Sequence, residues 1–255
     1  MKAMMTPGPA ATRAVLHVTA FALAVAALLT SRTAAAEMQP MHMMDDEIHG
    51  YFLVDRFEYR VNSGANTLDW DAEGWIGGDY NKLWLKSEGK KVVDGGVEDA
   101  EVQVLYSRLI TPFWDFQAGI RYDPKPDPTR GFAVFGVEGL APLFYEVEAA
   151  AFISHKGDVS ARINAEYDLL VTQRLILQPR VEMNFAAQEV RKLGIGSGLN
   201  DVELGLRLRY EIVRKVAPYV GVSWLRKVGR TADYADRAGD DIDTLSFVTG
   251  IRFWF

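Results

Sequence analysis

Hydrophobic and polar residues alternate along most of the chain from residue 50 onward, which is the pattern of β-strands with one apolar and one polar face. In one such stretch, Val102 and Val104 alternate with Glu101 and Gln103. The same period of two returns down to the last residue, which favours strands over helices throughout. The pattern predicts twelve strands, at 50–61, 67–77, 80–88, 97–110, 113–123, 131–140, 142–154, 158–170, 173–188, 199–213, 216–228 and 242–255.

The connections between these strands are alternately short and long, which favours a membrane barrel. Transmembrane β-barrels have short periplasmic turns and longer extracellular loops, and an even number of strands brings both termini to one side. We therefore predict an all-β fold, a transmembrane antiparallel β-barrel of about twelve strands with both termini periplasmic. The short connections are 78–79, 111–112, 141, 171–172 and 214–215, and the long ones are 89–96, 124–130, 189–198 and 229–241.

The apolar face of these strands is expected to contact the lipid of a bacterial outer membrane. A soluble β-sandwich, the competing fold, would bury the same face in a dry core. Aromatic residues near the strand ends favour the barrel, because they resemble its interfacial girdles. The terminal Phe255, on the apolar face of the last strand, resembles the signal that the outer-membrane assembly machinery recognises. The aromatic residues near strand ends are Tyr59, Trp114, Tyr122, Tyr145, Tyr167, Tyr210 and Trp224.

The polar face is expected to line the lumen. Its charges could form a cation pathway or a carboxylate site, or they could pair across neighbouring strands and fill a narrow barrel. Asp55 breaks the pattern, because it shares a face with Leu53, Phe57 and Tyr59; either a bulge shifts the register or Asp55 faces the lumen. The expected lumen charges are Asp69, Asp71, Glu73, Asp99, Glu101, Glu146, Glu148, Arg162, Glu166, Asp168, Arg174, Arg180, Glu182, Glu203, Arg207, Arg209 and Glu211.

The N-terminal 36 residues have the pattern of a secretory signal peptide. Lys2 and Arg13 supply its positive charge, and the apolar run at 14–29 is short for a transmembrane helix. Small residues at 34–36 form the expected cleavage site, and an N-terminal membrane anchor is the alternative. The predicted organisation is a signal peptide at 1–36, a short periplasmic segment rich in Met and His at 37–49, and a barrel at 50–255.

Charge and cysteine content narrow the functional classes. Residues 1–36 contain three of the 28 basic residues and none of the 34 acidic ones, so the remaining chain has a formal net charge of −9. This balance argues against nucleic acid as a partner and suits a surface that handles cations, or simply a soluble surface. The chain has no cysteine, which excludes disulfides, thiolate metal sites and thiol catalysis.

Soft metal ligands are concentrated just before the first predicted strand. Four of the five methionines beyond residue 36 lie between residues 37 and 49, with two of the three histidines. Thioether sulfur favours Cu(I), and imidazole accepts Cu(I) or Cu(II). The alternative is a leader whose composition has no function. The candidate copper ligands are Met38, Met41, His42, Met43, Met44 and His49.

No catalytic arrangement stands out in the sequence. His155 is the only histidine after residue 50, in a tight turn beside Ser154 and Asp158. Barrel hydrolases need a serine and a histidine together on a strand face, and there is no phosphate loop or dinucleotide motif. We predict that the protein is not an enzyme.

Five stretches of the sequence carry a family resemblance: 69–75 (DWDAEGW), 196–212 (GSGLNDVELGLRLRYEI), 217–222 (APYVGV), 229–233 (GRTAD) and 250–255 (GIRFWF). They resemble the outer-membrane copper resistance protein B family, and the resemblance covers about residues 45–255. It implies a periplasm-facing N-terminus, a copper-linked role and a place in a copper-detoxification operon. Members often have a long N-terminal region rich in Met and His, whereas here that region is only about a dozen residues long, which favours capture or transfer of copper over storage.

The predicted function is therefore an outer-membrane copper-binding barrel that contributes to copper resistance and homeostasis, with efflux of copper from the periplasm as its route. The expected partners are copper ions, outer-membrane lipid and a soluble periplasmic copper carrier, and nucleic acid is not expected. The main alternative is a general small-solute channel without metal specificity. A barrel enzyme acting on envelope lipid is a third hypothesis.

Overall fold

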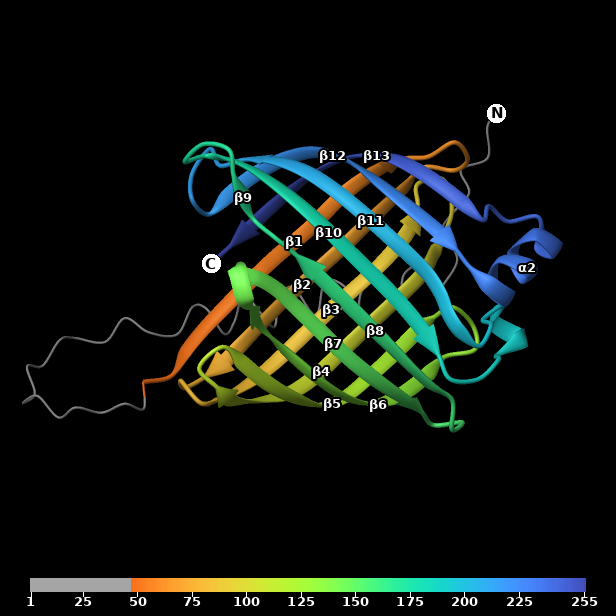
Figure 1. The fold of residues 1–255 in the computed structure, drawn as a ribbon, viewed down its shortest axis with the longest axis horizontal. Helices are drawn as coiled ribbons and strands as arrows, with labels where there is room; N and C mark the ends of the chain where they lie inside the picture. Colours follow the sequence, from red (N-terminus) through yellow and green to blue (C-terminus); the bar gives the residue numbers. More distant parts are fainter. Residues whose placement is uncertain (1–46) are drawn as a thin grey trace, which may run out of the picture. The chain divides into compact units, whose positions relative to one another are not determined.

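The computed structural model describes residues 47–255, which form one antiparallel sheet closed on itself. Twelve long strands surround a lumen, each bonded to the next long strand, and β1 and β13 close the ring (Figure 1). The predicted twelve-stranded antiparallel barrel is confirmed. The long strands are β1 (His49–Val61), β2 (Thr67–Gly77), β3 (Asn81–Val92), β4 (Val97–Thr111), β5 (Trp114–Lys125), β6 (Arg130–Ala141), β7 (Tyr145–Ser154), β8 (Val159–Glu166), β10 (Leu175–Ala186), β11 (Gly198–Tyr210), β12 (Val216–Lys227) and β13 (Asp243–Trp254).

The strand predicted at 158–170 is interrupted. β8 ends at Glu166, and the two-residue strand β9 (Leu169–Leu170) pairs only with β10. Between them, the Asp168 carboxylate accepts a hydrogen bond from Nη2 of Arg209 at 2.5 Å. β3 and β5 run past their predicted ends, to Val92 and Lys125, which shortens two of the predicted long connections.

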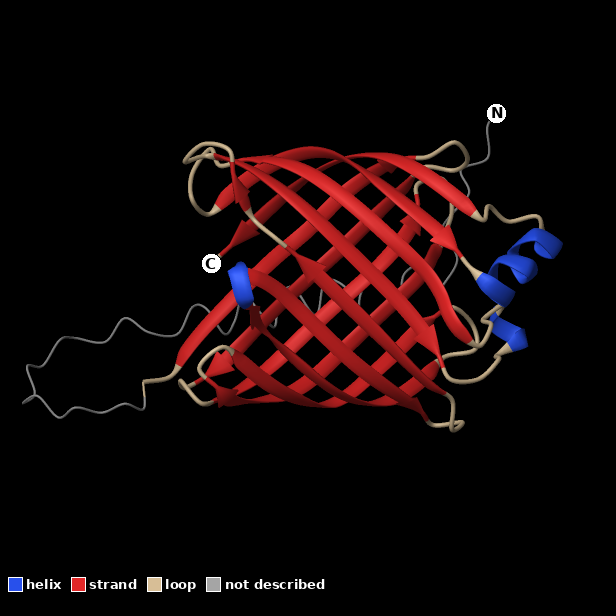
Figure 2. Cartoon of the chain, viewed as in Figure 1, coloured by secondary structure: helices blue, strands red, loops and turns tan. Residues whose placement is uncertain are grey.

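The two ends of the barrel differ, and we name them by their connections. The short-turn mouth is the end at which β1 begins and β13 ends, and it includes the 3-10 turn η1 (Pro142–Phe144). There the backbones of Phe52 and Phe255 exchange hydrogen bonds of 3.0 and 2.8 Å. The loop mouth is the opposite end, where the helices α2 (Gly229–Ala238) and η2 (Arg191–Leu193) lie (Figure 2).

The helix α2 corrects the prediction of an irregular loop at 229–241. Its C-terminus is capped by Gly239, whose left-handed backbone (φ 78°) lets its N–H bond to the helix carbonyls. The helix docks on the β10–β11 connection, where the backbone N–H of Gly196 donates to Thr231 Oγ1 at 3.0 Å and Arg230 pairs with Glu189 at 3.2 Å. Such docking depends on tertiary contacts that alternation does not encode.

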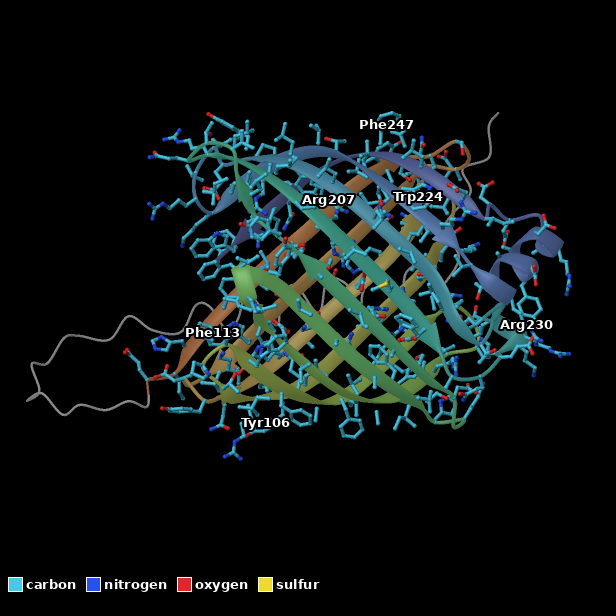
Figure 3. All side chains as sticks on the ribbon, viewed as in Figure 1. Tyr106, Phe113, Arg207, Trp224, Arg230 and Phe247 are labelled. Carbon is cyan, nitrogen blue, oxygen red and sulfur yellow. The ribbon has the colours of Figure 1, made fainter. Side chains whose placement is uncertain are left out.

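The outer surface of the barrel is apolar, as predicted for a lipid-facing wall. Leu204, Leu206 and Leu208 of β11 and Phe247 of β13 expose between 39% and 64% of their surface. Phe247 and Tyr106 project from opposite sides of the barrel wall (Figure 3). Among residues 47–255, the helices are too short or too polar to cross a membrane.

A β-bulge in β1 resolves the position of Asp55. The register of β1 with β2 shifts between Val54 and Arg56. Leu53 and Asp55 therefore face the lumen before the bulge, and Arg56 faces it afterwards. Both proposed explanations hold, because the extra residue reverses the alternation and Asp55 also points inward, where it accepts a hydrogen bond from Nε of Arg252 at 2.7 Å.

One part of the inner wall is apolar, which alternation did not single out. Trp84, Leu105, Val134 and Phe152 are at most 6% exposed and form a buried cluster. They occupy β3, β4, β6 and β7 at the same level of the barrel, with Gly119 of β5 completing the row. A Cβ atom on Gly119 would lie 2.0 Å from the Val104 carbonyl oxygen, so this position requires glycine.

Candidate functional site

Two cavities occupy the lumen, and their charges differ. A cavity of about 370 Å³ is lined by Leu53, Glu146 and Arg252, which lie near strand ends at the short-turn mouth. A second cavity of about 320 Å³ is lined by Asn62, Thr67 and other residues toward the loop mouth. The first cavity has nine acidic side chains against four basic ones, whereas the second has six of each. The acidic residues of the first are Asp55, Asp71, Glu73, Glu88, Glu101, Glu138, Glu146, Glu148 and Glu166.

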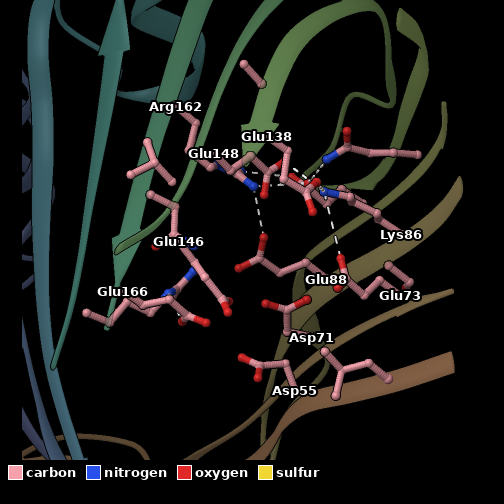
Figure 4. A pocket seen from close by; sticks show the side chains of 18 of the residues that line it. Asp55, Asp71, Glu73, Lys86, Glu88, Glu138, Glu146, Glu148, Arg162 and Glu166 are labelled. Atoms are coloured by element: carbon pink, nitrogen blue, oxygen red, sulfur yellow. Dashed lines mark hydrogen bonds and ion pairs between the residues drawn. The ribbon is translucent and has the colours of Figure 1, made fainter. Parts of the chain in front are cut away.

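A single lysine crosses the acidic cavity. Lys86 of β3 places Nζ 2.7 Å from Oε2 of Glu138 and 3.0 Å from Oε1 of Glu148, with Oε2 of Glu73 at 3.8 Å (Figure 4). Glu138 and Glu148 are directly opposite each other in the β6–β7 register, an arrangement of like charges that destabilises a sheet by itself. The lysine offsets this repulsion and connects β3 to β6 and β7, three and four strands away in the ring.

A second pair of like charges in the same cavity is less neutralised. Glu146 of β7 and Glu166 of β8 are directly opposite each other. Among the described residues, Glu146 forms no ion pair, and Nε of Arg180, at 4.0 Å from Oε2, is the only cation within 4.0 Å of Glu166. The end of the lumen nearest the short-turn mouth therefore holds two adjacent carboxyl groups with few cationic partners.

The middle of the lumen is crossed by a chain of ion pairs. Arg162 of β8 contacts Glu88 of β3 and Glu101 of β4, each at 2.9 Å. Arg56 holds the other oxygen of Glu88 at 2.9 Å, and Arg121 holds Glu101 at 2.8 Å. These five residues, named here the transverse bridge, come from five strands, β1, β3, β4, β5 and β8.

Toward the loop mouth, a fully buried carboxylate joins the strands on either side of the β1–β13 closure. Glu58 of β1 is 0% exposed. It accepts two hydrogen bonds of 3.0 Å from Arg207 of β11, one of 2.7 Å from Arg60 and one of 3.1 Å from the Tyr219 hydroxyl. Glu58 and its partners stabilise the fold rather than bind a ligand, because both carboxylate oxygens accept hydrogen bonds and the side chain has no exposed surface.

Most of the predicted lumen charges face inward and are paired. Asp168 pairs with Arg209 just beyond β8, and Arg174 and Glu211 lie in turns at the short-turn mouth rather than in the lumen. The period of two, extended along β3, β5, β6 and β13 and corrected for the bulge in β1, would have found the lumen charges that were missed. These include Arg56, Glu58, Arg60, Lys82, Lys86, Glu88, Lys90, Asp123, Glu138 and Arg252.

The predicted copper ligands fall largely outside the described residues. This applies to Met38, Met41, His42, Met43 and Met44. His49 is the first residue of β1, one position earlier than the predicted start of the barrel; it is exposed and pairs with Gly77 of β2. Within residues 47–255, no three His, Asp or Glu side chains are placed so that they could hold a metal ion.

A closed barrel with an apolar outside and a charged inside defines this chain as a bacterial outer-membrane β-barrel protein. Residues 48–255 match the family model described as "Copper resistance protein B precursor (CopB)", and the chain belongs to this family. It is 46% identical over 211 residues to the "Copper resistance protein B homolog" of Pseudomonas syringae pv. tomato (strain ATCC BAA-871 / DC3000), which covers 83% of this chain and 71% of that protein.

Two further likenesses agree with this assignment. The chain is 42% identical over 224 residues to the "Copper resistance protein B" of Escherichia coli, covering 88% of this chain and 75% of that protein. Among solved structures, a NanC porin superposes with a TM-score of 0.53 and 14% identity, covering 79% of this chain and 98% of the porin. At that identity the porin supports the barrel fold alone.

Proposed function

We propose that this barrel contributes to copper resistance and homeostasis by capturing copper at its short-turn mouth and letting the ion leave through the lumen. Membership of the copper resistance protein B family supports the role in copper resistance. The observation that carries the transport step is the acidic cavity next to that mouth, with its nine carboxylates against four cations. The family and the barrel also favour a membrane protein without enzymatic activity.

The capture step is assigned to the segment that precedes β1. Because β1 begins at the short-turn mouth, the segment at 37–48 joins the barrel there. Short turns are typical of the periplasmic side, so this mouth is the one that a soluble periplasmic copper carrier would meet. The proposed ligands are Met38, Met41, His42, Met43, Met44 and His49, with thioethers for Cu(I) and imidazoles for Cu(I) or Cu(II).

The ion then meets carboxylates rather than soft ligands. Carboxylate oxygens hold copper more weakly than thioethers hold Cu(I), so an acidic cavity suits passage better than storage. The pair Glu146 and Glu166, which has only one distant cationic partner, lies at the entrance to this route. A wide channel for neutral solutes is disfavoured, because Lys86 and the transverse bridge cross the lumen.

Replacing Met38, Met41, Met43 and Met44 together with leucine tests the capture step. This change keeps the bulk of the side chains and removes the sulfur, so Cu(I) affinity should fall by more than about tenfold, with a smaller effect on Cu(II). Competitive titration of the purified full-length protein under reducing conditions measures this affinity. The barrel should remain heat-modifiable in detergent, because the four positions precede β1.

The matched control changes His42 and His49 to alanine, which should weaken Cu(II) more than Cu(I). His49 lies in β1, but its pairing with Gly77 is made by the backbone and its side chain is exposed, so the barrel should still form. Unchanged Cu(I) affinity in the four-methionine variant would remove this segment as the capture site.

A further inference from the structure

Arg162 reaches across the barrel as well as along its wall, where its Nε donates to Asn184 of β10 at 3.3 Å and lies 3.8 Å from Glu182. It lies on β8, whose bonded neighbours are β7 and β10, yet its guanidinium contacts Glu88 of β3 and Glu101 of β4. In the ring of twelve long strands, β4 and β3 are four and five strands away from β8. The contact therefore spans the lumen, as the close view of the cavity shows for Arg162 and Glu88 (Figure 4).

The two glutamates would repel each other without this arginine. Glu88 and Glu101 are directly opposite each other in the β3–β4 register. Nη1 of Arg162 donates to Glu88 at 2.9 Å and to Glu101 at 3.1 Å, and Nη2 donates to Glu101 at 2.9 Å. The guanidinium thus occupies the position between two carboxylates where a small cation would be attracted.

The same residues mark the boundary between the two cavities. Of all the residues that line them, only Glu88, Glu101 and Arg162 belong to both. On one side of this boundary the lining is strongly acidic, and on the other it is balanced. A solute that crosses the barrel must pass the point where Arg162 is held.

We propose that Arg162 closes the lumen and sets its charge selectivity, so that passage requires a cation that competes with the guanidinium for Glu88 and Glu101. The inference deepens the proposed copper route, on which it rests. Arg56 holds the other oxygen of Glu88, and Arg121 shares Oε2 of Glu101 with Arg162, so both glutamates keep a cationic partner when Arg162 moves away. Anions that enter from the short-turn mouth meet the acidic cavity first, and from either side they cannot replace the guanidinium between two carboxylates, so they are excluded.

Conductance of the purified full-length barrel in planar lipid bilayers, in potassium chloride without copper, tests this role. The Arg162→Gln variant should conduct several-fold more than the unaltered protein. Its preference for potassium over chloride should rise about tenfold, because one positive charge has been removed from a low-dielectric constriction. Arg162→Lys keeps the charge and should retain the original selectivity.

Two further variants make the test decisive. Arg226→Gln removes an arginine that is 55% exposed and pairs with Asp243 outside the lumen, so its conductance should match that of the unaltered protein. The Glu88→Gln/Glu101→Gln variant leaves Arg162 with only the more distant Glu182, at 3.8 Å, and should lose the preference for potassium. Folding is checked by heat modifiability, and if Arg162→Gln does not fold, the glutamine pair decides.

Unchanged conductance and selectivity in folded Arg162→Gln would overturn the proposal, as would an unchanged ion preference in the glutamine pair. Neither result bears on copper capture, because the salt contains no copper and the titration of the N-terminal variants is independent of lumen conductance. Conversely, unchanged Cu(I) affinity in the four-methionine variant would argue against the capture site and would not affect the proposed role of Arg162.

Discussion

Replacing Arg207 with leucine should destabilise the barrel by about 3 kcal/mol, because it removes a partner from a buried carboxylate. Glu58 is fully buried, and two of its four hydrogen bonds come from Arg207, which is itself only 2% exposed. Arg60 and Tyr219 remain in contact with Glu58, which keeps the cost at the low end of the range for broken buried ion pairs. Urea unfolding of the barrel in lipid vesicles, followed by tryptophan fluorescence, measures it.

A double variant separates the buried charge from the lost packing. Glu58→Gln combined with Arg207→Leu removes the negative charge as well, so it should be less destabilised than Arg207→Leu alone. Arg226→Leu, at a half-exposed site, should cost less than about 0.5 kcal/mol. Equal losses for Arg207→Leu and Arg226→Leu would show that the Glu58 cluster does not stabilise the fold.

Alternation predicted most of the fold because the inward and outward directions of side chains are set by strand geometry itself. The outward positions of Leu204, Leu206 and Leu208 follow directly from it. It marked Asp55 as a break in the pattern but left a bulge and an inward side chain as alternatives, since a bulge depends on how two partner strands align. Alternation also did not predict the helix α2, because the helix is held by tertiary contacts with the β10–β11 connection.

The sequence predicted many of the charged residues that face the lumen, but not which of them form ion pairs with each other. Arg162 and Glu88 are 74 residues apart, and their contact depends on closure of the ring and on which strands then lie opposite each other. From alternation alone, replacing the inward Arg207 with leucine is expected to cost less stability than replacing the outward Leu206 with arginine. The hydrogen bonds from Arg207 to Glu58 bring the two expected costs to a similar size. The copper ligands at Met38–Met44 lie outside the described residues and stay a prediction.

Replacing Leu206 with arginine should cost about 2–4 kcal/mol, since a charged side chain would then face lipid near the middle of the membrane. Leu206 is 42% exposed on the outer wall, and its cross-strand neighbours are Pro179 of β10 and Val222 of β12. These side chains offer no carboxylate to the new guanidinium. The loss should appear as a lower free energy of unfolding in lipid vesicles, with the barrel still able to assemble in detergent.

The same substitution at Leu245 provides the matched control. Leu245 is 55% exposed on the outer wall but lies two residues after the start of β13, near the loop mouth and Asp243. An arginine there can reach the lipid headgroups or that carboxylate, so the cost should be only about 0–1 kcal/mol. The difference between the two sites measures depth in the bilayer rather than loss of a leucine. Equal costs at Leu206 and Leu245 would mean that the outer wall of β11 does not face the hydrocarbon core, and the assignment of inner and outer faces would have to be reversed.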